Sequence, residues 1–183
     1  MKRITLTALA LALTLGLASL HAATVTVTGA ENKSQLSPLE RKIRAELITL
    51  PFYGVFDYLE FDLQGGKVIL KGEVSRPTLQ SSAVQVVERI PGVTQVVDQV
   101  QVLPLSPFDN GIRRRLMRAI YGDNVLNRYA AGANPWIRLI VRDGKITLEG
   151  YVDRNADKDI AFIRANGVTG AFSVTNNLKV KHG

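Results

Sequence analysis

The fold is decided by the stretch Gly66-Lys67-Val68-Ile69-Leu70-Lys71-Gly72-Glu73-Val74-Ser75-Arg76, which returns as Gly144-Lys145-Ile146-Thr147-Leu148-Glu149-Gly150-Tyr151-Val152-Asp153-Arg154. The match continues without a gap to Val102 in the first copy and Val180 in the second. A duplication of this kind predicts two modules of one fold. Residues kept in both copies report on the fold, and residues that differ mark where one copy has acquired a function of its own.

Each copy is predicted to run in the order helix, strand, strand, helix, strand. The motifs Ser37-Pro38-Leu39-Glu40 and Ser106-Pro107-Phe108-Asp109 begin the first helices, because serine caps a helix, proline suits its first turn and an acidic residue follows at the capping-box position. The alternating segments are 58–63, 68–74 and 95–102 in the first copy, and 136–141, 146–152 and 173–180 in the second. The second helices are expected over 77–90 and 155–166.

Glycine recurs at the turns and inside the strands. Gly65-Gly66 and Asp143-Gly144 suit the tight turns of hairpins. Gly72 and Gly150 occupy the same place inside the second strand, where glycine weakens a strand unless another element packs closely. We interpret both as making room for a helix.

These elements predict an α+β fold of two tandem domains, over residues 37–105 and 106–183. Each domain is expected to be a three-stranded mixed sheet with two helices on one face. Residues 24–36 are interpreted mainly as a flexible lead-in, although Thr24-Val25-Thr26-Val27-Thr28 could pair as a strand.

The first 23 residues have the pattern of a secretory signal peptide. A basic start, Met1-Lys2-Arg3, precedes an apolar run from Ile4 to Leu20 and then small residues for cleavage, Ala22-Ala23. An uncleaved membrane anchor is the alternative, but the run is short for a span and has no basic flank behind it. No cysteine follows, which excludes a lipoprotein anchor. We therefore expect a periplasmic or extracellular protein.

The composition argues against an enzyme. The chain has no cysteine, and its two histidines are His21, in the predicted signal peptide, and His182, next to the C-terminus. The commonest metal ligands and the commonest general base are thus missing. An all-carboxylate site stays open, but no acidic pair stands out, and we expect neither a cofactor nor a metal.

The repeated pattern resembles the BON domain family, small modules found in bacterial periplasmic proteins. The residues that carry the resemblance are 66–74 and 144–152, with the later Gly92-Val93 and Val96-Val97-Asp98 and their equivalents from Gly170 to Val180. It implies a non-enzymatic module that associates with phospholipid surfaces or helps maintain the cell envelope. The family has no catalytic residues to transfer to this chain.

The two copies differ in charge. Residues 37–105 hold seven Lys/Arg against eight Asp/Glu, whereas residues 106–183 hold thirteen against seven, so the net charges are −1 and +6. A basic surface attracts anionic lipid headgroups, by about 1 kcal/mol for each Lys or Arg near the membrane. The second copy is therefore the expected binding module.

The second copy also carries a basic cluster and an insertion. Its first helix contains Arg113-Arg114-Arg115 and Arg118, where the first copy has Arg44-Ala45-Glu46. The segment before its first strand is nine residues longer. Aromatic side chains beside arginines suit a membrane interface, but they can equally complete the core, and the charge run can be an ordinary solvated face. The candidate lipid-binding residues are Arg113, Arg114, Arg115, Arg118, Tyr121, Arg128, Tyr129 and Trp136.

Two classes of function compete. The first is an envelope protein that binds anionic phospholipid surfaces, mainly through the basic second domain, and helps maintain envelope integrity. The alternative is a periplasmic chaperone or protein-interaction module of the osmotic or envelope stress response, with other envelope proteins as partners. Nucleic acid is an unlikely partner of a secreted chain, and the arginines are not interleaved with an RNA-binding aromatic motif.

Overall fold

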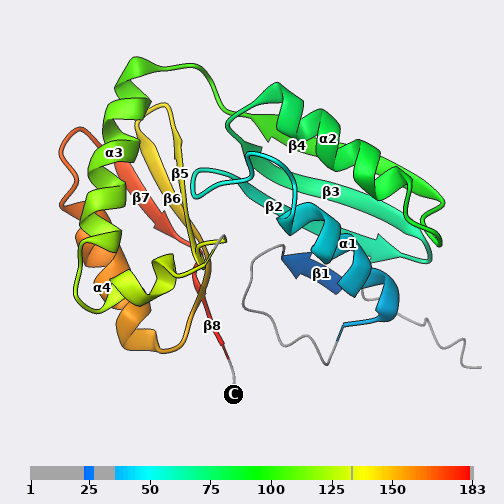
Figure 1. The fold of residues 1–183 in the computed structure, drawn as a ribbon. Coiled ribbons are helices and arrows are strands. Elements are labelled where there is room, and N and C mark those ends of the chain that lie inside the picture. Colours follow the sequence, from blue (N-terminus) through cyan, green and yellow to red (C-terminus); the bar gives the residue numbers. More distant parts are fainter. Residues whose placement is uncertain (1–22, 27–35, 133, 182–183) are drawn as a thin grey trace, which may run out of the picture.

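The computed structural model describes residues 23–26, 36–132 and 134–181, which form two modules in succession (Figure 1). The first module contains β1 (Ala23–Thr26), α1 (Pro38–Ile48), β2 (Tyr58–Gln64), β3 (Lys67–Val74), α2 (Pro77–Glu88) and β4 (Gln95–Val102). The second contains α3 (Pro107–Tyr121), the 3-10 helix η1 (Leu126–Ala130), β5 (Ile137–Arg142), β6 (Lys145–Val152), α4 (Asn155–Asn166), β7 (Ser173–Asn176) and β8 (Lys179–Val180). The α+β fold class and the tandem arrangement are confirmed.

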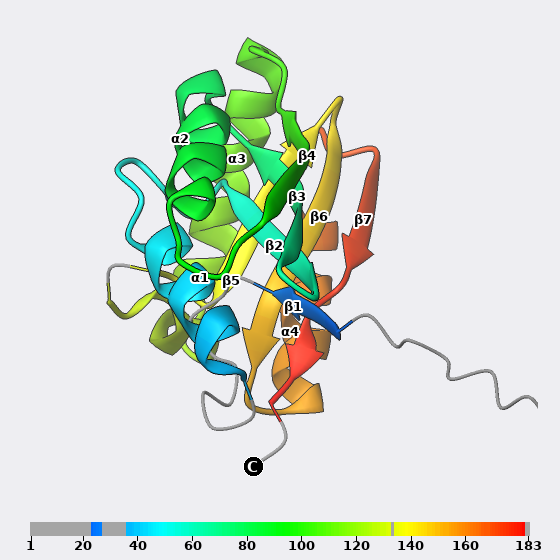
Figure 2. The same cartoon turned by 90° about the vertical axis from the view of Figure 1, so that its right-hand side faces the viewer.

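In both modules an antiparallel hairpin is followed by a helix and a parallel strand. β2 pairs antiparallel with β3, and β3 pairs parallel with β4; β5, β6 and β7 repeat this arrangement. Helices α1 and α2 lie together on one side of strands β2 to β4 (Figure 2). The faces of the strands that point toward the helices supply the core of each module.

The segment before the first module departs from the expected flexible lead-in at its start. Ala23–Thr26 forms β1, which pairs antiparallel with β2 and places Ala23 opposite Leu63 and Thr26 opposite Glu60. The first sheet therefore has the expected three strands and an additional edge strand, in the order β1-β2-β3-β4. Of the predicted signal peptide, residues 1–22 lie outside the described residues and Ala23 is the first residue of β1; residues 27–35 also lie outside the described residues.

Both opening helices begin where the serine-proline motifs place them. In α1 the Ser37 hydroxyl accepts a hydrogen bond from the Glu40 N–H at 3.2 Å, and the Glu40 carboxylate accepts one from the Ser37 N–H at 2.6 Å. This confirms the capping box. In α3 the Ser106 hydroxyl accepts from the Asp109 N–H at 3.1 Å, but the Asp109 carboxylate does not return to the cap.

Asp109 instead binds the hairpin turn of its own module. Its two carboxylate oxygens accept hydrogen bonds from the N–H groups of Asp143, at 3.0 Å, and Gly144, at 2.8 Å. Both turn residues have positive φ, as do Gly65 and Gly66 in the first module, which agrees with the predicted tight turns. The completely buried Asp109 side chain thus joins the start of α3 to the β5–β6 turn.

The strand glycines face a neighbouring strand, which corrects their interpretation as helix-packing sites. A Cβ atom at Gly72 would lie 2.1 Å from the Tyr58 carbonyl oxygen, and one at Gly150 would lie 2.0 Å from that of Trp136. Both glycines also have positive φ, 121° and 109°. Glycine is required because the adjacent backbone leaves no room for a side chain.

The last strand of each module carries a side chain that binds its own backbone. The Asp98 carboxylate accepts a hydrogen bond from the Val100 N–H at 2.9 Å, and the Asn176 side-chain oxygen accepts one from the Leu178 N–H at 3.2 Å. The two positions are equivalent in the repeat. In the second module the predicted strand 173–180 is interrupted there and becomes β7 and β8, both paired with β6.

The loop between α1 and β2 docks the first module onto β5 of the second. Leu139 donates its N–H to the Val55 carbonyl at 2.8 Å, and the fully buried Arg138 donates to the Gly54 carbonyl at 2.7 Å. The Arg138 guanidinium also lies 4.4 Å from the centre of the Tyr53 ring, within range of a cation–π interaction. The first module therefore covers part of the outer edge of the second sheet.

Apolar and ionic contacts extend this interface. Tyr58 and Leu103 form a small buried cluster with Ile140 on the face of β5 that points away from its helices. Arg142 forms an ion pair with Glu73 at 2.7 Å. Side chains from both sheets thus hold the two modules together. Although the modules are copies of one fold, they share an interface.

Candidate functional site

The arginine cluster of α3 is divided between the interior and the surface. Arg113 is only 7% exposed, and its guanidinium donates to the Val141 carbonyl at 2.7 Å and to the Asn110 side chain at 2.6 Å. Burial lowers the pKa of Arg113. This corrects its interpretation as a lipid contact, because its charge is used to hold α3 against β5.

The other three arginines lie on the outer side of the helix. Arg114 and Arg118 are exposed, and Arg115 is half-exposed and donates to the Thr169 carbonyl at 3.0 Å. None of the three forms an ion pair with a carboxylate in the described part of the chain. They therefore leave three uncompensated positive charges on one helix face.

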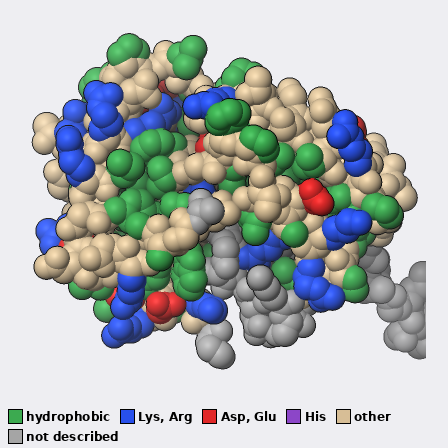
Figure 3. All heavy atoms as spheres, in the orientation of Figure 1, with side chains coloured by type: hydrophobic (Ala, Val, Ile, Leu, Met, Phe, Trp, Pro, Cys, Tyr) green, Lys and Arg blue, Asp and Glu red, His purple; other side chains and the backbone are tan. Residues whose placement is uncertain are grey.

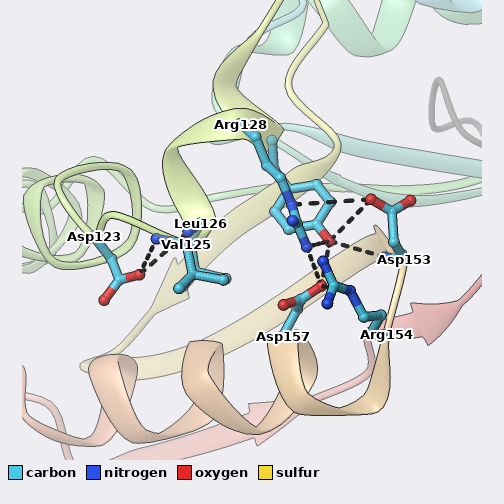
Figure 4. A network of polar contacts seen from close by, with 8 residues as sticks. Asp123, Val125, Leu126, Arg128, Asp153, Arg154 and Asp157 are labelled. Atoms are coloured by element: carbon cyan, nitrogen blue, oxygen red, sulfur yellow. Dashed lines mark hydrogen bonds and ion pairs between the residues drawn. The ribbon is translucent and has the colours of Figure 1, made fainter.

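The insertion folds into η1, and its polar residues anchor it (Figure 4). The Asp123 carboxylate accepts hydrogen bonds from the N–H groups of Val125, at 2.8 Å, and Leu126, at 3.2 Å, and pairs with Arg164 at 2.7 Å. The Val125 bond is the chief cause that lowers the pKa of Asp123. These contacts fix the insertion between α3 and α4.

Arg128 and Tyr129 belong to the same anchor and not to a free basic surface. The Tyr129 hydroxyl donates to Asp157 at 2.7 Å and accepts from the Asp153 N–H at 2.9 Å (Figure 4). Arg128 pairs with Asp157 and Asp153. Tyr129 is buried, which raises its pKa. The Tyr129 ring therefore lies in the core, whereas Arg128 remains exposed with its charge balanced by neighbouring carboxylates.

Tyr121 and Trp136 complete the core beside η1. The Tyr121 hydroxyl donates to the Ile137 carbonyl, and burial raises its pKa. The Trp136 ring lies 6.0 Å from that of Tyr129, and Lys181 lies 5.4 Å from its centre on the outside. Both rings thus pack against the core of the second module and remain partly exposed.

A stacked aromatic pair lies near the N-terminal end of α3. Phe108 and Phe172 are 49% and 74% exposed, and their ring centres are 5.8 Å apart. In the first module the equivalent positions hold Leu39 and Thr94. The second module therefore has exposed aromatic surface near the arginines, with Phe108 on α3 and Phe172 just before β7, a signal that comparison of the two copies could have found.

An apolar groove of about 630 Å³ runs along the opposite flank of α3. Figure 3 shows hydrophobic side chains gathered over the region where α3 approaches the first module, with basic side chains nearby. The lining residues are Val55, Met117, Arg118, Tyr121, Gly122, Ala130 and Pro135. Sequence reasoning missed this groove because Val55 comes from the other module and its position depends on the docking of the two.

The described residues contain no cluster of three or more metal-ligating side chains. None of the helices in this part of the chain combines the length and the apolar composition that a membrane crossing requires. What the second module offers is positive charge on α3 between an aromatic pair and an apolar groove.

The chain was compared with known structures, curated proteins and family models. Two chains from a structural protein of the type III secretion system of Chlamydia trachomatis, CdsD, align with 16% identity and a TM-score of 0.29. One alignment covers 76% of this chain and 90% of the other, and the second, to the C-terminal domain, covers 81% and 99%. No curated protein matches the chain. The pattern of the BON domain matches residues 36–104 and again residues 109–182, and the chain therefore belongs to the BON domain family.

Proposed function

We propose that this chain is a non-enzymatic periplasmic protein that binds anionic phospholipid surfaces through α3 of its second BON domain and helps maintain the envelope. BON domains are associated with membrane binding, occur in envelope proteins and are generally non-enzymatic. The observation that carries the proposal is the set of arginines without carboxylate partners on the outer side of α3, the exposed Arg114 and Arg118 and the half-exposed Arg115.

The distribution of charge supports the second domain as the binding module. Most other arginines of this domain have partners within the protein. Carboxylates pair with Arg128, Arg142 and Arg164, and Arg138 is buried at the interface. Positive charge that is not balanced locally attracts anionic headgroups over a Debye length of about 8 Å at physiological salt. The α3 face is where such charge is concentrated.

Apolar side chains beside the arginines support a membrane surface over a soluble anion. Phe108 and Phe172 lie on one flank of α3, and Met117, 41% exposed, lies on the other. A peripheral membrane protein combines electrostatic attraction with the burial of apolar surface at the headgroup boundary. Charge alone would suit any polyanion, whereas this combination suits lipid.

The test is co-sedimentation with vesicles that contain phosphatidylglycerol, at low and at high salt. Wild-type protein is expected to bind, and binding should weaken as salt rises. The double variant Arg114→Glu/Arg118→Glu removes two cations worth about 1 kcal/mol each and adds repulsion, so affinity should fall by roughly 30-fold or more.

The matched control is Lys42→Glu/Arg89→Glu, which makes the same change in charge at exposed positions of the first domain. It should retain most of the binding. Equal losses in the two variants would contradict a role for α3, and a wild-type protein that ignores acidic vesicles at low salt would overturn the proposal. Suppression of aggregation of an unfolded envelope protein, unchanged by both variants, would favour the chaperone alternative.

A further inference from the structure

We infer that the apolar groove beside α3 takes one acyl chain of an anionic phospholipid, with the lipid phosphate on Arg118. This inference rests on the proposed function, because it names the ligand of the same surface. It assigns a site for a single lipid molecule in addition to attraction by the membrane as a whole.

The walls of the groove suit a hydrocarbon chain. Val55, Met117, Ala130 and Pro135 present apolar side chains, and the Tyr121 hydroxyl is turned to the Ile137 carbonyl. The groove measures about 630 Å³, within the range of roughly 300–1,000 Å³ in which ligand pockets usually fall. An apolar chain would remain in contact with apolar surface along this channel, whereas a polar peptide would find few partners.

Arg118 marks the point where the apolar lining ends. It lines the groove and also a second pocket of about 670 Å³, to which the polar residues Asp123, Asn124 and Arg164 contribute. Arg164 is neutralised by Asp123 at 2.7 Å, but Arg118 has no carboxylate partner among the described residues. The surface thus changes from apolar to cationic at Arg118. An amphiphile could place its hydrocarbon chain on the apolar part and its anionic head on the arginine.

The groove is a property of the second copy docked on the first. Ala130 and Pro135 belong to the insertion, and Val55 belongs to the loop that donates its carbonyl to Leu139 across the interface. The insertion therefore has a structural consequence, since it supplies one wall of a site that the first copy lacks. This gives the first module a part in lipid binding, as the second wall.

Met117 provides the probe, because the chain has only two methionines and the other is Met1. The experiment uses protein labelled with ¹³C at the methionine methyl, and Met117→Leu assigns the signal. Dihexanoyl phosphatidylglycerol is added below the concentration at which it forms micelles, with dihexanoyl phosphatidylcholine as the zwitterionic comparison. We expect a saturable shift of the Met117 methyl signal, reached at several-fold lower concentration with phosphatidylglycerol, and nuclear Overhauser contacts to acyl-chain protons.

Ala130→Trp fills the groove, and Ala131→Trp is its matched control at an exposed neighbouring position outside the lining. The first should abolish the saturable shift and the second should retain it. If wild-type protein shows no saturable shift and no contact to acyl protons, the inference fails whether or not Ala130→Trp folds. Vesicle binding that persists in that case leaves the proposed function standing, whereas a saturable shift without vesicle binding would overturn surface binding and retain the lipid site.

Discussion

Replacement of Gly150 with alanine tests whether close approach of two strands explains the repeated glycine. The added Cβ would lie 2.0 Å from the Trp136 carbonyl oxygen, whereas carbon–oxygen contacts between strands are normally about 3.3 Å or longer. The strands would have to separate by more than about 1 Å. That movement would break the 3.1 Å hydrogen bond from the Tyr151 N–H to the same carbonyl.

Two costs add in this variant. Positive φ costs an alanine about 1–2 kcal/mol, and the displaced strand pair loses hydrogen bonds and packing, so the free energy of unfolding should fall by about 4 kcal/mol or more. The control is Gly132→Ala, which also has positive φ, 88°, but meets no atom within 4 Å. It should lose only the backbone cost of about 1–2 kcal/mol.

Urea unfolding followed by the fluorescence of Trp136, the only tryptophan, measures both variants in the second domain. With a slope of about 2 kcal/mol per molar urea, Gly150→Ala should lower the midpoint by roughly 2 M, and Gly132→Ala by less than about 1 M. Equal midpoints in the two variants would refute the reasoning, because the contact with Trp136 would then carry no cost.

Three further predictions concern polar groups that are buried, as Asp109 and Arg113 are, or partly buried, as Glu149 is. Asp109→Ala leaves the N–H groups of Asp143 and Gly144 without their acceptor, so the free energy of unfolding, measured in urea, should fall by about 3 kcal/mol, and a value near zero would contradict the anchoring role. Arg113→Met deprives the Val141 carbonyl of its donor, so the free energy of unfolding in urea should fall by about 1–3 kcal/mol. Vesicle binding should be unchanged in this variant. A stable variant that no longer binds vesicles would show that Arg113 contacts lipid. Burial, with repulsion from neighbouring glutamates, raises the pKa of Glu149, so its ionisation at neutral pH opposes folding. Glu149→Gln should therefore raise the urea midpoint at pH 7, and the difference should vanish as the pH falls to about 4, near the pKa of an unfolded glutamate; a difference that grows on acidification would contradict this sign.

The sequence was a good guide to elements whose residues interact locally. Ser37 and Ser106, each followed by a proline, located two helix starts. Alternation of apolar and polar residues, together with glycines at the turns, located both hairpins. Because the sequence repeats, each predicted element was supported by the same pattern in both copies. Where it misled was at Gly72 and Gly150, because the pattern reports that space is tight but not which element occupies it.

The candidate site was harder to predict than the fold. Residues 113–115 read as one basic run, but successive residues on a helix point about 100° apart, so Arg113 turns inward while Arg114 faces outward. Tyr129 is buried and Arg128 is exposed, and both bind Asp157, which the fold brings beside them. Such pairings join positions about 30 residues apart, and no local pattern specifies them.

The side-chain bonds of Asp98 and Asn176 have a consequence for how one chain can hold two copies of a sheet. Similar strands in tandem can pair with the wrong copy or with another molecule, and an open edge favours this. At Val100 and Leu178 the N–H that an incoming strand would need is already bound by the last strand's own side chain. Each copy thus removes one backbone donor from its open edge at the same position of the repeat, which disfavours pairing with an incoming strand at that point.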